Sequence, residues 1–158
     1  MSEQRTMQDW LDAYGASHQN PLNKKIHWVC VPLIFLTIVG LLWSIPVPGT
    51  LNNHSWINVA TILIVPVTIF YARLSRPLAV GMALWCIFCF ILCWLYESRV
   101  TVPLWNSCIA VFVLAWAAQF YGHKIEGVKP SFFEDIQFLM IGPAWLMSFI
   151  YHRLGIRY

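Results

Sequence analysis

Long apolar runs alternate with short polar segments along the chain, and four of the runs have lengths close to that of a membrane-spanning helix. A transmembrane helix needs roughly 20 mostly apolar residues, within a range of ~17–25. The runs 26–45, 78–96 and 102–121 meet this requirement, and the run 56–71 is slightly short. The pattern therefore predicts an all-α, polytopic membrane helical bundle with four spanning helices.

A fifth apolar stretch, 136–151, is shorter and contains the pair Gly142-Pro143. Proline removes a backbone donor and kinks or interrupts a helix. We therefore expect a Gly-Pro-interrupted segment that is re-entrant or lies against the bundle, rather than a fifth span.

The polar N-terminal segment carries apolar side chains at helical spacing. These are Met7, Trp10, Leu11 and Tyr14, with amides and acids between them. Such a stripe predicts an N-terminal interfacial helix that packs on the bundle or on lipid headgroups. The segment lacks a basic region followed by an apolar core, so we expect no signal peptide.

Composition narrows the class of protein. The 158 residues are 59% hydrophobic, 16% aromatic and only 11% charged, whereas a soluble domain carries roughly 25% charged residues. This excludes a disordered chain, a nucleic-acid-binding module and an ordinary cytosolic enzyme. We expect a single integral membrane domain, 1–158, that contacts membrane lipid and no nucleic acid. A homo-oligomer is left open.

Lysine and arginine are distributed unevenly between the two sides of the predicted bundle. One side holds nine of them: Arg5, Lys24, Lys25, Arg73, Arg76, Lys124, Lys129, Arg153 and Arg157. Only Arg99 lies on the other side, and a fifth span would reduce the ratio to seven against three. The positive-inside rule then places both termini in the cytoplasm. We expect the membrane to be a bacterial inner membrane, or the endoplasmic reticulum in a eukaryote.

The cysteines do not suggest a disulfide framework, because their number is odd and all five lie inside apolar runs. Cys86, Cys89 and Cys93 share one helix face, which leaves a soft metal site open. Polarizable filler between packed helices is the favoured interpretation.

The predicted topology sorts the five histidines. His18 precedes the first run, His27 opens it and His123 closes the fourth, so all three lie at the same cytoplasmic interface. His54 lies in a loop across the membrane, roughly 30 Å away, and we expect it to be dispensable. His152 joins the three only if the C-terminal segment turns back.

Polar side chains accompany the three histidines at helical spacing. Tyr14 lies four residues before His18, and Asn23 lies four residues before His27. Each of these pairs can share a helix face. Polar neighbours at this spacing favour a common site over three unrelated interfacial histidines.

On the fourth run, Trp116, Gln119, His123 and Glu126 form one stripe. A buried amide needs a partner, so the simplest role of Gln119 is to orient His123 or a ligand. Imidazole suits first-row metals such as iron, zinc and copper, and three histidines with open positions resemble a catalytic site. Spacing alone leaves a purely structural role equally open.

Two blocks resemble the signature blocks of a known membrane family: YGASHQNPLNKKIHWVCVP at 14–32 and WAAQFYGHKIEGVKPSFFED at 116–135. The family was long described only as a domain of unknown function. It is associated with the Fe(II)-dependent 2-hydroxy fatty acid dioxygenase of phytosphingosine breakdown in yeast. The resemblance covers essentially the whole chain, although the middle runs match only as generic apolar helices. The family pattern falls here on His18, Asn23, His27, Gln119, Phe120, Gly122, His123 and Glu126.

The resemblance implies α-oxidation, in which O₂ and Fe(II) shorten a long-chain 2-hydroxy fatty acid by one carbon. It leaves open whether Glu126 or His152 completes the iron ligands, and which chain length is preferred. The residues implied are the metal ligands His18, His27 and His123 and the catalytic residues Glu126, Gln119, Asn23 and Tyr14.

Two rival classes remain. A haem electron-transfer protein would use His27 and His123 as axial ligands, although both lie at span ends. A small transporter or scaffold would use the histidines only for gating or hydrogen bonding, and it would bind no metal.

Overall fold

The protein is all-helical in the part of the chain that the structure, a computed structural model, describes: residues 5–47, 56–133 and 137–158. This confirms the predicted all-α class. In the described residues, the only β-type pairing is an isolated bridge between Pro46 and Asn58. The helices are α1 (Met7–Ala16), α2 (Pro21–Trp43), α3 (Val59–Leu74), α4 (Arg76–Arg99), α5 (Leu104–Glu126), the 3₁₀ helix η1 (Ser131–Phe133) and α6 (Phe138–Leu154).

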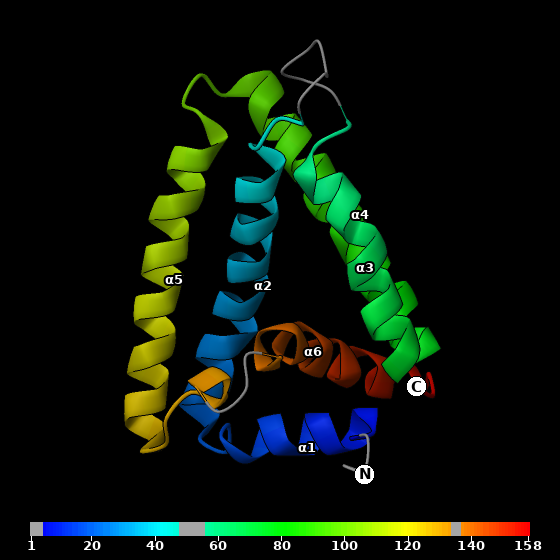
Figure 1. Cartoon of the computed structure of the whole chain (residues 1–158). Helices are drawn as coiled ribbons and strands as arrows, with labels where there is room; N and C mark the ends of the chain where they lie inside the picture. The colour runs from blue at the N-terminus through cyan, green and yellow to red at the C-terminus, as the bar shows by residue number, and fades with distance from the viewer. Residues whose placement is uncertain (1–4, 48–55, 134–136) are drawn as a thin grey trace.

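The helix α2 lies at the centre of the fold, with α5 on one side and the pair α3 and α4 on the other (Figure 1). It packs more extensively against α5 than against any other helix. At one end of the long helices, α1 and α6 lie across them and pack on each other (Figure 1). The C-terminus lies at this same end.

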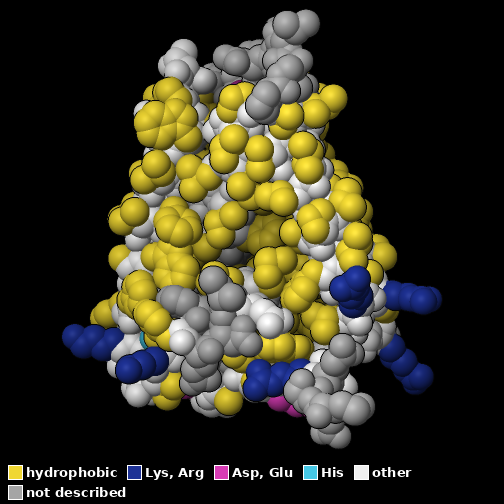
Figure 2. Space-filling view, in the orientation of Figure 1, with side chains coloured by type: hydrophobic (Ala, Val, Ile, Leu, Met, Phe, Trp, Pro, Cys, Tyr) yellow, Lys and Arg dark blue, Asp and Glu magenta, His cyan; other side chains and the backbone are white. Residues whose placement is uncertain are grey.

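Three helices are long and apolar enough to cross a membrane. Their most apolar windows have mean hydropathies of 2.2 for α2, 2.5 for α4 and 1.4 for α5. The helix α3 is also apolar but has only 16 residues, so the four-span count stays a prediction. On the face shown in Figure 2, hydrophobic side chains cover the long helices, and the visible Lys and Arg side chains lie towards the end that carries α1 and α6.

The predicted spans correspond to α2, α3, α4 and α5, with boundaries set by local caps. The second span begins later than its apolar run because Asn58 caps α3. Its side chain accepts a hydrogen bond from the Thr61 N–H at 3.1 Å, and the Thr61 hydroxyl accepts one from the Asn58 N–H at 3.0 Å. This reciprocal capping box fixes the helix start.

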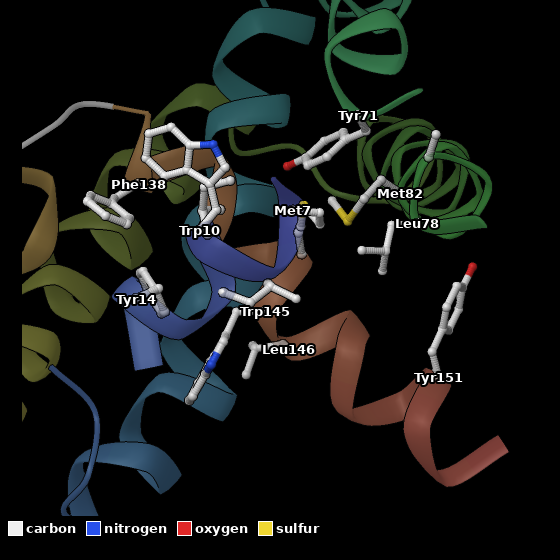
Figure 3. Close-up of a cluster of buried hydrophobic side chains, with 14 of the residues drawn as sticks. Met7, Trp10, Tyr14, Tyr71, Leu78, Met82, Phe138, Trp145, Leu146 and Tyr151 are labelled. Carbon is white, nitrogen blue, oxygen red and sulfur yellow. The ribbon is translucent and has the colours of Figure 1, made fainter. Parts of the chain in front are cut away.

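The N-terminal helix has the predicted buried face. All four residues of its stripe are buried, and they join an apolar cluster with residues of α3, α4 and α6 (Figure 3). The Trp10 and Phe138 rings meet edge to face with centroids 5.2 Å apart. The stripe therefore packs on the bundle itself.

The helix α6 lies against the bundle as expected, but it is not interrupted. It runs unbroken through Pro143, which corrects the expectation of a Gly-Pro break. Proline costs a helix one backbone hydrogen bond, and here packing on both sides of α6 outweighs that loss. Gly142 has a packing role, because a Cβ there would lie 2.9 Å from the Tyr14 hydroxyl.

All five cysteines lie in the described part of the chain, and each is free and buried. Cys89, Cys93 and Cys108 pack in an apolar cluster with side chains such as Trp43. Within the described residues, no group of cysteines has the geometry of a metal site. These thiols therefore act as packing groups in the core.

Candidate metal centre

Three histidines from three segments converge near the end of the bundle where α1 and α6 lie. His18 follows α1, His27 lies in the second turn of α2, and His123 lies in the last turn of α5. Their side chains are buried, with exposed fractions of 0%, 1% and 5%. The fold thus brings together residues that are 105 positions apart, from 18 to 123.

The three imidazole rings are in mutual contact. The His18 ring centroid lies 4.2 Å from that of His27 and 4.9 Å from that of His123. The His27 and His123 centroids are 4.9 Å apart. One nitrogen of each ring can face a common point, and these nitrogens all lie within 4.8 Å of one another. We call this group the histidine trio.

The other two histidines do not join the trio. His152 lies in the last turn of α6 and is exposed. It is absent from the trio, which is the only such group of potential metal ligands in the described ranges. His54 lies outside the described residues.

Backbone carbonyls fix the tautomers of two of the rings. The Nδ1 of His18 lies 2.6 Å from the Tyr14 carbonyl oxygen, and the Nδ1 of His27 lies 3.0 Å from that of Asn23. Because a carbonyl only accepts, each Nδ1 carries the proton and each Nε2 keeps its lone pair. Burial lowers the pKa of His18 to about 4, so its ring is neutral near pH 7.

Two buried ring nitrogens of the trio allow a test of whether these residues fit a metal ion. His18 Nε2 and His123 Nδ1 are buried, and neither has a hydrogen-bond partner among the described residues. A buried polar atom without a partner is costly. A divalent first-row metal would satisfy both, since neutral imidazole is its common ligand. His27 offers its Nε2 lone pair beside them, and the potential ligand atoms of the trio lie within 4.8 Å of one another. The donor set therefore fits such an ion.

Glu126, in contrast, is directed at the loop between α1 and α2. Its carboxylate accepts hydrogen bonds from the backbone N–H of Gln19 at 2.8 Å and of Asn20 at 2.8 Å. It also accepts one from the side-chain amide of Asn23 at 3.0 Å. We call these contacts the loop clamp. Glu126 lies outside the group of potential metal ligands, and its contacts hold the loop that carries His18.

Asn23 connects the loop clamp to the trio. Its side chain is fully buried and bonds Glu126, while its carbonyl accepts from His27. The close approach of α5 depends on Gly122, because a Cβ at that position would collide with the Asn23 side-chain oxygen. The glycine one residue before His123 therefore has a steric role.

Tyr14 and Gln119 lie beside the trio and line the cavity that contains it. The Tyr14 ring stacks on the His18 ring, with centroids 4.3 Å apart and planes 16° apart. Gln119 lies one turn before His123 on α5 and is 8% exposed. The cavity has a volume of about 60 Å³ for the centres of water molecules, more than the ~10–15 Å³ that one water needs.

Two serines complete the surroundings of His18, and sequence reasoning missed both. The Ser17 and Ser131 hydroxyls lie 2.6 Å apart, and the Ser17 hydroxyl also lies 3.1 Å from His18 Nδ1. This contact ties η1 to the trio. Ser17 is next to His18 in the sequence, but Ser131 lies 114 positions away from Ser17, and no spacing pattern connects them.

The fold and the site together define a class of protein: an apolar helical bundle of membrane type, with three buried imidazoles that line a cavity. The sequence match then gives the family. The chain belongs to the Mpo1-like family, whose model is described as 2-hydroxy-palmitic acid dioxygenase Mpo1-like and matches residues 4–154. This confirms the resemblance seen in the two sequence blocks. No curated protein and no solved structure matches the chain. The family description indicates an oxidoreductase that acts on 2-hydroxy fatty acids.

Proposed function

We propose that this protein is an Fe(II)-dependent dioxygenase that shortens long-chain 2-hydroxy fatty acids by one carbon. The histidine trio carries the proposal: two of its buried ring nitrogens have no partner among the described residues. The family description supports the substrate class. The ligands would be Nε2 of His18, Nε2 of His27 and Nδ1 of His123.

The net reaction balances without a further reactant. One 2-hydroxy acid, R–CH(OH)–COOH, and one O₂ give R–COOH, CO₂ and H₂O. The bond between C1 and C2 breaks, and all electrons that reduce O₂ come from the substrate. Iron, when bound, supplies the activation of O₂.

The residues around the trio would bind and orient the substrate. A 2-hydroxyl and a carboxylate on adjacent carbons can together approach one ion, whereas an acid without the hydroxyl offers the carboxylate alone. Gln119 and Tyr14, two of the polar residues that line the cavity, would contact this headgroup. Non-hydroxylated acids should therefore be poor substrates.

The loop clamp and the backbone carbonyls would hold the ligands in place. Glu126 secures the loop that carries His18. The carbonyls of Tyr14 and Asn23 keep two imidazoles in the tautomer that presents Nε2. Carbonyl partners of this kind raise the basicity of metal-binding histidines.

We further propose that the trio lies at the cytoplasmic surface of the membrane, with both termini on that side. Nine of the ten Lys and Arg residues support this orientation. A site at this depth suits an amphiphile, because the headgroup can reach the trio while the tail stays among the helices.

The haem alternative is disfavoured by the geometry of the trio. The rings of His27 and His123 meet edge to face at 4.9 Å, which leaves no space between them for a macrocycle. The transporter or scaffold alternative predicts no bound metal, so metal analysis separates it from the proposed enzyme.

The decisive experiment uses purified protein, reconstituted in lipid and loaded with ferrous iron. A labelled 2-hydroxyhexadecanoic acid is supplied under air and under nitrogen, and the acid that is one carbon shorter is measured. We expect product only with iron and O₂. Equal product under nitrogen, or full activity of iron-stripped protein, would reject the proposal.

A further inference from the structure

The cavity at the trio continues away from it as an apolar channel along α2. On one face of that helix, His27 is followed by Val31, Ile34, Phe35 and Ile38, all of which line the cavity. Their spacing of three and four residues forms a single stripe. The channel is therefore polar at the trio and apolar along the helix.

The far end of this channel reaches the outer surface of the bundle. Ile38 is 38% exposed, whereas Ile34 is only 7% exposed. Both lie within α2, one of the helices apolar enough to cross a membrane. The channel therefore opens sideways, towards the hydrocarbon of a bilayer.

We propose that the α2 stripe from Val31 to Ile38 is the acyl-chain subsite of the enzyme, and that Ile38 forms its opening to the bilayer. The inference rests on the proposed function, because it takes the occupant to be the tail of the acid whose headgroup reaches the trio. The part of a long tail that passes this opening then lies in the hydrocarbon of the bilayer.

The length of the channel limits the number of tail carbons that can lie inside the protein. Eleven residues separate His27 from Ile38, which corresponds to ~16 Å at ~1.5 Å per residue. An extended chain advances ~1.3 Å per carbon, given C–C bonds of ~1.5 Å. On the order of twelve carbons therefore lie inside the protein, and longer tails extend into lipid.

Ile34 and Ile38 should consequently act on different chain lengths. Ile34 lies seven residues from His27, or ~10 Å along the helix. The tail of 2-hydroxydecanoic acid reaches this far, while that of 2-hydroxyhexadecanoic acid passes Ile38. Blocking the channel at Ile38 should therefore affect only the longer acid.

The kinetic test compares three tryptophan variants on α2. Val29→Trp is the matched control, because Val29 is 61% exposed and does not line the cavity. Ile38→Trp should lower kcat/KM for the C16 acid by about tenfold or more, as steric changes in apolar pockets do, and leave the C10 acid within about twofold. Ile34→Trp should reduce both, and Val29→Trp neither. Equal loss for both acids in Ile38→Trp, or the same profile for Val29→Trp, would overturn the subsite.

A second measurement needs no turnover and no variant. The wild-type protein is incubated with a 2-hydroxy C16 acid that carries a diazirine at C12, illuminated and analysed by peptide mass spectrometry. We expect labelling of α2 near Ile34 to Ile38, and loss of that label with excess unlabelled acid. Labelling confined to α3 and α4 would reject the channel.

The two experiments separate this inference from the proposed reaction. If α2 is labelled but the 2-hydroxy acid is not shortened in an O₂-dependent reaction, the acyl-chain subsite stands and the proposed reaction is rejected. If the acids are shortened and the Ile38→Trp and Ile34→Trp variants have the same chain-length preference as wild type, the proposed reaction stands and the acyl-chain subsite is rejected.

Discussion

The side-chain amide of Asn23 donates a hydrogen bond to the carboxylate of Glu126 at 3.0 Å, joining the first turn of α2 to the last turn of α5. The two residues are 103 positions apart in the sequence. Backbone N–H groups of Gln19 and Asn20 bind the same carboxylate. The acid thereby fixes the loop that ends α1 relative to the helix that carries His123.

Replacing Glu126 by Gln should weaken metal binding without removing a ligand. The amide keeps one acceptor oxygen, but its NH₂ group faces backbone donors. We expect a loss of metal affinity of ~10–100-fold, which is typical for groups that orient metal-binding histidines. Titration with Co²⁺ measures the affinity. The exposed acid Asp12, bonded only to Gln8 among the described side chains, gives the control Asp12→Asn. Equal affinities for Glu126→Gln and wild type would contradict the loop clamp.

Alanine at His18, His27 or His123 should abolish bound metal, because two imidazoles hold a divalent ion much less tightly than three. The controls are His152→Ala, an exposed position, and His54→Ala, which lies outside the described residues. Metal content is measured on protein purified without chelator. A tenfold loss in either control, in folded protein, would show that the ligand set is wrong.

Alanine substitutions at two glycines should distinguish the effect of overpacking near the trio from the effect of overpacking elsewhere in the bundle. A Cβ at Gly122 would collide with Asn23, and a Cβ at Gly40 would collide with the Cys108 sulfur. Overpacking of this kind costs ~1–3 kcal/mol, so both alanine variants should melt earlier than wild type. Only Gly122→Ala should also lower the affinity for Co²⁺. A similar affinity for both variants would contradict the steric role assigned to Gly122.

Reporter fusions at Ser2 and Tyr158 should place both termini in the cytoplasm. The prediction follows from the lysine and arginine asymmetry and agrees with α6 lying across the bundle (Figure 1). A fusion after Arg99 should report the opposite side. Termini on opposite faces of the membrane would mean that the four-span topology is wrong.

Much of the helical framework is determined by local sequence. Apolar runs set the positions of α2 to α5, because burying backbone groups in an apolar environment requires helices with internal hydrogen bonds. The stripe at Met7, Trp10, Leu11 and Tyr14 determined which face of α1 is buried. The same local pattern placed His18, His27 and His123 at one end of the bundle. The buried face of α1 followed from spacing along one helix, and the common interface of the histidines followed from the order of the apolar runs.

Only the tertiary structure decided how the three histidines are used. Their tautomers depend on the carbonyls of Tyr14 and Asn23, and the partners of Glu126 are backbone N–H groups. Every residue carries such groups, so no sequence pattern marks the ones that matter. The unbroken helix through Pro143 and the contact between Ser17 and Ser131 have the same origin. Packing of α6 against other segments outweighed the local tendency of Pro143 to break the helix. Packing between distant segments also brought Ser17 and Ser131 together, although no periodic spacing in the sequence connects them.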